Sequence, residues 1–172
     1  MNSNKRVYIV NGRPRAGKGT LIQIMKDNYP VHHLSTVDTV KVLARQMGWN
    51  GTKTPENRQM LSDLKDFYSK NFDGPFREMT EATNSHDYCV FEIREPKEIE
   101  RLQKWCELNW IICDTILVQS DKHDATSTCH SDVNVDGFDY RYIVNNYNSL
   151  DDYEHNCKEF LKSIMDEDEE DE

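Results

Sequence analysis

A glycine-rich turn follows a short apolar stretch near the N-terminus, and this combination constrains the fold more than any other part of the chain. The stretch from Val7 to Val10 is apolar and rich in β-branched residues, so it predicts a buried strand over about residues 5–11. The segment 12–20, GRPRAGKGT, follows it and leads into a helical pattern. A strand, such a turn and a helix start aim backbone N–H groups and the positive end of the helix at one point. The sequence therefore predicts an α/β fold with an anion site at the tip of its first strand.

The residue types within this turn fit a polyphosphate ligand. Glycines at 12 and 17 permit backbone conformations and close approaches that a Cβ would block. Lys18 supplies a positive charge on a flexible stem for phosphate oxygens. Gly19 stands where the magnesium-binding hydroxyl usually lies in this motif, and Thr20 comes one place later. The residues of this turn that are expected to bind the nucleotide are Gly12, Arg13, Arg15, Ala16, Gly17, Lys18, Gly19 and Thr20.

Length and charge limit the classes of protein to which the chain can belong. Its 172 residues contain no internal repeat and no linker rich in Pro, Gly and Ser, which predicts a single domain over 1–165. Residues 166–172 are all acidic and are expected to form a disordered tail. A formal net charge of −10 disfavours a nucleic-acid partner, because such a partner needs a basic surface.

Cysteine usage and hydropathy predict where the protein works. The 5 cysteines lack C-x-x-C spacing, and neither a signal peptide nor a transmembrane run is recognisable. Unpaired thiols are typical of a reducing compartment. We therefore expect a cytoplasmic protein with no membrane partner.

Strand and helix patterns alternate along the rest of the chain. Helices are expected after the turn up to Asn28 and from a cap at Ser35 or Thr36 up to Gly48. This alternation predicts a parallel sheet with helices on both faces, whose ligand binds beyond the carboxyl ends of the strands. The turn and the segments 35–41, 92–96 and 119–138 would meet there. The remaining expected strands are 31–34, 88–93, 114–119 and 140–145, and the remaining helices are 55–71, 75–83, 97–109 and 150–165.

Three stretches resemble those of P-loop nucleoside monophosphate kinases. The GKGT ending of the turn is the form found in these enzymes. The segment 34–41, LSTVDTVK, resembles the STGDxxR stretch of adenylate-type kinases, with Val37 replacing glycine and Lys41 replacing arginine. The segment 91–96, FEIREP, takes the place of their DGFPR stretch. Together with 93–99, 130–132 and 142–150, these stretches make the chain most similar to the phage deoxynucleoside monophosphate kinases of the adenylate-kinase-like superfamily.

This resemblance implies a three-layer P-loop kinase fold with a five-stranded parallel sheet in the order 2-3-1-4-5. It implies an acceptor-binding region at about 35–86 and a short lid at about 119–138. From this lid Lys122 would bind the nucleotide phosphates, unless Arg13 and Arg15 supply that charge from the turn. ATP and Mg²⁺ would be the cofactors, and a nucleoside or deoxynucleoside monophosphate would accept the γ-phosphoryl group to give the diphosphate.

The resemblance also implies roles for individual residues. Lys18, Arg94 and Arg15 would be catalytic, because they would neutralise charge on the transferring phosphoryl group. Thr20 and Glu92 would hold the magnesium ion through water. The residues that would bind the acceptor are Thr36, Lys41, Arg58 and Arg94.

Several of these residues also have purely structural interpretations. Ser35 to Asp38 could serve only as a helix cap. Arg94 could form a surface ion pair with Glu95 or Glu98. Arg58 and Lys65, seven positions apart on one helix face, could face the acceptor or simply face solvent.

Two other functions fit the same sequence. A kinase of this fold could use a non-nucleotide phosphorylated metabolite such as phosphomevalonate, and would differ only in its acceptor pocket. A nucleotide-binding regulatory module with little turnover is the second alternative, because Lys122 to Asp124 partly resembles a guanine-reading motif. The sequence leaves the base, the sugar and the oligomeric state open.

Overall fold

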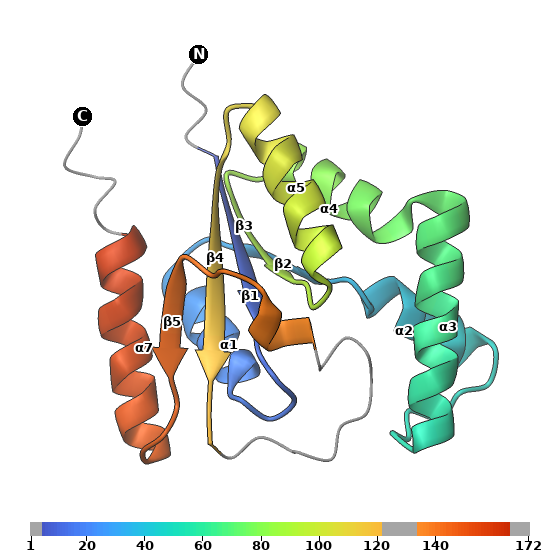
Figure 1. The fold of residues 1–172 in the computed structure, drawn as a ribbon, viewed down its shortest axis with the longest axis horizontal. Helices are drawn as coiled ribbons and strands as arrows, with labels where there is room; N and C mark the ends of the chain where they lie inside the picture. The colour runs from blue at the N-terminus through green and yellow to red at the C-terminus, as the bar shows by residue number, and fades with distance from the viewer. Residues whose placement is uncertain (1–4, 122–133, 166–172) are drawn as a thin grey trace.

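A five-stranded, all-parallel sheet forms the centre of the computed structural model (Figure 1). Its order is β2-β3-β1-β4-β5, which is the order that the resemblance to P-loop kinases implies. The structure describes residues 5–121 and 134–165. Lys122, most of the expected lid and the acidic tail lie outside the described residues. The strands are β1 (Arg6–Asn11), β2 (His32–Ser35), β3 (Tyr88–Glu92), β4 (Ile112–Gln119) and β5 (Tyr142–Asn145).

Helices cover both faces of the sheet, and β1 shows why. Its side chains alternate, so that Tyr8 and Val10 join one core cluster while Val7 and Ile9 join the other. The first cluster packs under α1 (Lys18–Asn28) and α7 (Leu150–Met165), and the second packs under α4 (Gly74–Ser85) and α5 (Pro96–Leu108). The result is the predicted three-layer arrangement.

Two further helices stand at the β2 side of the sheet, opposite α7 (Figure 1). They are α2 (Asp38–Gln46) and α3 (Pro55–Phe72), and α3 has no buried residue. Polar contacts hold α3 instead: the Tyr68 hydroxyl lies 2.6 Å from a Glu78 carboxylate oxygen on α4, which Thr39 of α2 also contacts. A short 3-10 helix, η1 (Asn134–Gly137), precedes β5.

The start of α2 differs from the prediction. Its N-cap residue is Val37, without a capping side chain, and not Ser35 or Thr36. The Asp38 carboxylate accepts the Ser35 backbone N–H at 2.8 Å. Asp38 is the first residue of α2, so a side chain of the helix itself closes the turn that precedes it. The cap of α3 does follow the usual pattern, because the Thr54 hydroxyl accepts the Asn57 N–H at 3.2 Å.

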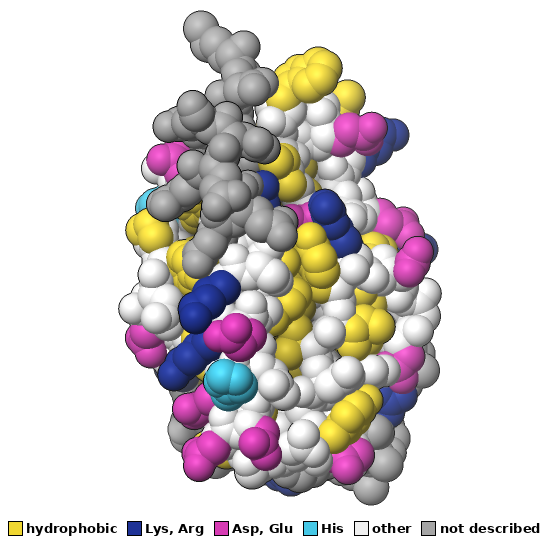
Figure 2. Space-filling view, turned by 90° about the vertical axis from the view of Figure 1, so that its left-hand side faces the viewer, with side chains coloured by type: hydrophobic (Ala, Val, Ile, Leu, Met, Phe, Trp, Pro, Cys, Tyr) yellow, Lys and Arg dark blue, Asp and Glu magenta, His cyan; other side chains and the backbone are white. Residues whose placement is uncertain are grey.

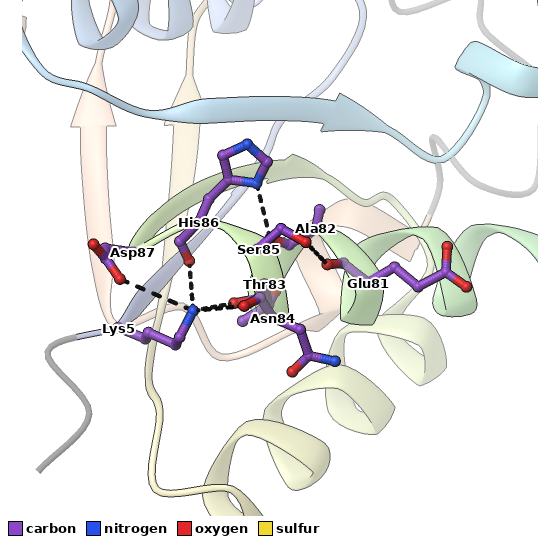
Figure 3. Close-up of polar contacts among 8 residues, drawn as sticks. All are labelled: Lys5, Glu81, Ala82, Thr83, Asn84, Ser85, His86 and Asp87. Carbon is purple, nitrogen blue, oxygen red and sulfur yellow. Dashed lines mark hydrogen bonds and ion pairs between the residues drawn. The ribbon is translucent and has the colours of Figure 1, made fainter. Parts of the chain in front are cut away.

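Lys5 fixes the C-terminal end of α4 against the start of β1 (Figure 3). Its ammonium donates to the carbonyl oxygens of Thr83, Asn84 and His86 at 2.8, 3.0 and 3.1 Å. A cation at this helix end satisfies carbonyl groups that have no partner within the helix. The contact ties the C-terminal end of α4 to the residue that precedes β1.

The face that carries α7 mixes hydrophobic and charged side chains (Figure 2). The edge strand β5, the turn after it and the start of α7 expose Ile143, Tyr147 and Leu150, respectively. Among the described helices, none combines the length and hydropathy that crossing a bilayer would require.

Candidate functional site

The turn between β1 and α1 wraps around the carboxyl end of the central strand. Gly12 and Gly17 have φ values of 153° and 109°, which disfavour other residues. A Cβ at Gly12 would lie 2.5 Å from the carbonyl oxygen of Val118, and one at Gly17 would lie 2.7 Å from the amide nitrogen of Asn146. Both glycines are therefore required by close approach as well as by backbone conformation. At Gly19, in contrast, a Cβ would meet open space.

Lys18 folds back over this turn. Its side chain is buried, and its ammonium donates to the carbonyl oxygens of Gly12 and Arg13 at 2.6 and 3.0 Å. These contacts hold a positive charge at the centre of the loop, where an anion would meet it together with the N–H groups of the α1 start. Thr20 follows on the first turn of α1 and is half-buried.

The two arginines of the turn behave differently. Arg13 donates through Nε to the Asp136 carboxylate of η1 at 3.1 Å, and a second guanidinium nitrogen contacts the same oxygen. Arg15 is exposed at the crest of the turn, with a φ of 65°. Ala16 is buried beneath them. The turn thus presents one arginine that is tied to η1 and one that faces solvent.

Glu92 ends β3 beside the turn, next to Val10 of β1. Burial disfavours its charged form, but a hydrogen bond with the Nε2 atom of His33 at 3.1 Å and the positive charges of His33, Lys18 and Lys41 hold the pKa of Glu92 below its usual value. Glu92 is therefore a carboxylate at neutral pH. The contribution of His33 was not anticipated from the sequence.

Part of the expected acceptor region converges on Glu92. The buried Thr36 donates its backbone N–H to the Glu92 carbonyl oxygen at 3.2 Å. The Lys41 ammonium lies 3.5 Å from an Asp38 carboxylate oxygen, and its charge acts on Glu92. Thr36 thus contacts Glu92 through the backbone, and the charges of Lys41 and Lys18 both act on the Glu92 carboxylate.

The two remaining acceptor candidates, Arg94 and Arg58, lie in different parts of the fold. Arg94 follows β3, and its carbonyl oxygen accepts the side-chain amide of the buried Asn11 at 3.2 Å, which ties it to the end of β1. Arg58 is exposed on α3, away from these contacts. Lys65 pairs with Glu98 at 2.8 Å, so the carboxylate that the sequence offered as an ion-pair partner for Arg94 also contacts a lysine.

Asn11 is a second residue that sequence reasoning missed. Its side chain accepts the Gly12 N–H at 2.8 Å and contacts the Tyr140 hydroxyl at 2.7 Å. Burial raises the pKa of Tyr140 to about 12, so its hydroxyl stays protonated and donates to the Val135 carbonyl oxygen at 2.9 Å. The available signal in the sequence was an asparagine at the last position of the predicted strand, directly before the first loop glycine.

A cavity of about 290 Å³ opens next to the turn. Its walls come from the end of β4, the turn itself, η1 and the loop after β5. Within it, the Tyr147 hydroxyl lies 3.2 Å from the side-chain oxygen of Gln119. A larger open hollow of about 580 Å³ lies between α5 and the beginning of β4, at the other end of that strand. The residues that line the smaller cavity are Arg13, Ala16, Leu117, Val118, Gln119, Ser120, Asp121, Asp136 and Tyr147.

The donor set beside the turn fits magnesium bound with a phosphate ligand. In the described part of the chain, no cluster of three or more His, Cys, Asp or Glu side chains could hold a metal ion by itself. Mg²⁺ in phosphoryl-transfer sites keeps several waters and takes only one or two carboxylates plus substrate phosphates. The ionised Glu92 beside the loop meets that requirement.

The fold is shared with proteins of known structure. No family model and no curated protein sequence matches the chain. A suspected kinase from Chloroflexus aurantiacus is 14% identical, with a TM-score of 0.59 over 95% of this chain and 99% of that one. Dephospho-CoA kinase from Campylobacter jejuni is 13% identical, with a TM-score of 0.54 over 95% and 99%. A Thermus thermophilus protein is 15% identical, with a TM-score of 0.51 over 94% and 98%. At such identities the likeness shows the fold alone, and that fold is the P-loop kinase fold.

Proposed function

We propose that this protein is an ATP-dependent kinase that transfers the γ-phosphoryl group to a nucleoside or deoxynucleoside monophosphate. The observation that carries the proposal is the loop between β1 and α1, with two glycines in close backbone contact and a buried lysine at its centre. The fold and the resemblance of the loop to that of nucleoside monophosphate kinases support it. Residues 1–165 would form the kinase domain, with the acceptor region at about 35–86 and the lid at about 119–138.

Phosphoryl transfer needs positioning and charge neutralisation more than covalent chemistry from the protein. The loop N–H groups and Lys18 would bind the phosphates of ATP, and the adjacent 290 Å³ cavity would receive its base. Arg15 and Arg94 would add positive charge around the moving group. Thr20 and Glu92 would hold Mg²⁺ through water, and the ion would supply positive charge that offsets the charge of the phosphates.

The acceptor phosphate would bind beside Glu92, where Thr36 and Lys41 lie together. Arg58 would join them only if α3 moved toward the loop. Such a movement is compatible with the packing, because α3 buries none of its side chains.

A different acceptor is the second candidate. Dephospho-CoA kinase shows that a kinase of this fold can serve an acceptor other than a simple nucleoside monophosphate. A non-nucleotide phosphorylated metabolite would use the same loop and the same Lys18, so only the acceptor pocket separates the two proposals. A regulatory module with little turnover would use the loop without forming acceptor-dependent ADP.

An assay of ADP formation with a panel of acceptors tests the proposal. The panel contains ribo- and deoxynucleoside monophosphates, phosphomevalonate and dephospho-CoA, and a reaction without acceptor gives the background. We expect at least one nucleoside monophosphate to raise ADP formation well above that background. Stimulation by phosphomevalonate or dephospho-CoA alone would support the second candidate, and ATP binding without stimulation by any acceptor would support the regulatory module.

A further inference from the structure

Two consecutive carbonyl groups of the loop are held by side chains from the C-terminal part of the chain. The side-chain amide of Asn146 donates to the Ala16 carbonyl oxygen at 3.0 Å, and the hydroxyl of Tyr153 donates to the Gly17 carbonyl oxygen at 3.0 Å. Asn146 follows β5, and Tyr153 lies in the first turn of α7. Neither residue belongs to the loop motif or to the catalytic set described above.

These contacts help to orient two peptide groups of the loop, and the Gly17 carbonyl oxygen also accepts the backbone N–H groups of Thr20 and Leu21 at 3.1 and 3.2 Å. The described chain contains no cis peptide bond. In a trans peptide group the carbonyl oxygen and the following N–H point in opposite directions. Binding the Ala16 oxygen on the α7 side therefore turns the Gly17 N–H away from that side, and binding the Gly17 oxygen does the same for the Lys18 N–H.

The side chains that hold the loop are themselves fixed. The Asn146 backbone N–H donates to the Gln119 carbonyl oxygen at 2.7 Å, which anchors it to the end of β4. Tyr153 is 1% exposed and belongs to the core cluster between the sheet and the α1 and α7 layer. Burial raises the pKa of Tyr153 well above its usual value, so its hydroxyl remains a donor across the physiological range.

The lack of a side chain at Gly17 completes the fit. A Cβ there would lie 2.7 Å from the Asn146 amide nitrogen and 2.9 Å from the Tyr153 ring. Glycine at this position thus admits both donors to the backbone, in addition to allowing a φ of 109°. The contact therefore requires both a glycine at position 17 and the side chains of Asn146 and Tyr153.

We propose that Asn146 and Tyr153 are positioning residues for the phosphate site, because they orient the peptide groups whose N–H groups receive the phosphate chain. The inference rests on the proposed function in one respect, namely that the loop binds polyphosphate. It adds that the affinity of the loop depends in part on residues outside its own sequence, in the turn after β5 and the first turn of α7. Oriented amides bind an anion without the free-energy cost of reorienting them.

The test measures polyphosphate affinity by calorimetry in the full chain and four variants. Asn146→Ala removes one donor, and Tyr153→Phe removes a single hydroxyl. Asn145→Ala and Tyr142→Phe are matched controls, since Asn145 is exposed and Tyr142 packs its ring edge-on against Phe160. The probes are ATP with Mg²⁺ and inorganic tripolyphosphate, which lacks base and sugar. Thermal melting verifies that each protein is folded at the titration temperature.

We expect each of the two variants to weaken both probes by about fivefold, the effect of losing one neutral hydrogen bond, and the controls to stay within about twofold of wild type. Unchanged affinity in both variants, with or without a lower Tm, would overturn the positioning role. Weakening of ATP but not of tripolyphosphate would overturn it as well, because the effect would then concern the base. If wild type itself binds neither probe, the proposed function fails, which is a separate and recognisable result.

Discussion

At the scale of single residues, Lys18 carries the most charge-dependent part of the proposed chemistry. Its ammonium is held over the loop by two backbone carbonyls. Replacing it with methionine keeps the length of the side chain and removes the charge. We expect Lys18→Met to lower kcat by about 100- to 1,000-fold, as expected for the loss of one preorganised group at a phosphoryl site. Steady-state ADP formation measures this, with the exposed Lys26→Met on α1 as control. Near-normal turnover of Lys18→Met would contradict the assignment.

The loop glycines predict opposite effects of the same substitution. Alanine at Gly17 would be strained at a φ of 109° and would press on Asn146 and Tyr153, so we expect a loss of about 1–3 kcal/mol in unfolding free energy. Alanine at Gly19 meets open space in α1 and should stabilise by about 0.5–1 kcal/mol. Urea unfolding of both variants tests the pair. Equal effects would show that the loop geometry is wrong.

The positions of the loop residues could be predicted from the sequence, but the contacts that other parts of the chain make with them could not. The strand, glycine and lysine pattern is local, so the position of Lys18 follows from neighbours in the chain. The bond between His33 and Glu92 depends on the register of β2 against β3, and a shift of one residue would send His33 to the other face. Asn146 and Tyr153 reach the loop from more than 120 residues away, as their separations of 130 and 136 positions show.

At the scale of elements, the alternation of strands and helices was sufficient to predict the sheet and its layers. The start of α2 differs from the predicted one, because local side-chain contacts decide where a helix begins. The Asp38 carboxylate, and not Ser35 or Thr36, closes the turn before α2. For α3, helical spacing in the sequence predicts the helix but not its lack of buried residues, since burial depends on whether a partner surface exists.

The unequal burial of the helices predicts unequal local stability. Helix α5 buries Ile99, Leu102 and Cys106, whereas α3 buries no side chain. Local opening is easier where few apolar contacts are lost. We expect the backbone amides in the middle of α3 to exchange with deuterium at least about tenfold faster than those in the middle of α5, as measured by mass spectrometry. Equal protection in the isolated protein would contradict the described packing of α3.

The contact between β2 and α4 predicts a pH dependence of stability. The ring of His32 stacks on His86 with centroids 4.0 Å apart, and burial, followed by the charges of His86 and His33, lowers the pKa of His32 from 6.5. As pH falls through that value, the unfolded chain takes up a proton at this site more readily than the folded one. The free energy of unfolding therefore decreases as the pH falls below about 6.5 and increases again as the pH rises.

Replacing His32 with glutamine tests this pH dependence. We expect His32→Gln to lose less stability than wild type between pH 7.5 and pH 5.5 in urea unfolding, while His155→Gln, at an exposed position of α7, behaves like wild type. An identical loss in wild type and His32→Gln would mean that other groups account for the pH dependence.

At the scale of the whole molecule, an acidic chain concentrates positive charge at one place. The formal net charge is −10, yet Arg13, Arg15 and Lys18 lie within a single turn at the carboxyl ends of the strands. Such an arrangement suits a small anionic ligand better than an extended polyanion. The position follows from the topology, since parallel strands deliver their following loops to one edge of the sheet.

The central claim is that the protein transfers a phosphoryl group from ATP at this edge of the sheet. The most direct test follows the labelled γ-phosphate of ATP in the presence of a nucleoside monophosphate, with wild type and Lys18→Met side by side. The account predicts that wild type moves the label into a nucleoside diphosphate and that the variant does so far more slowly. Label that stays in ATP, or that appears only as inorganic phosphate at the same rate in both proteins, would contradict it.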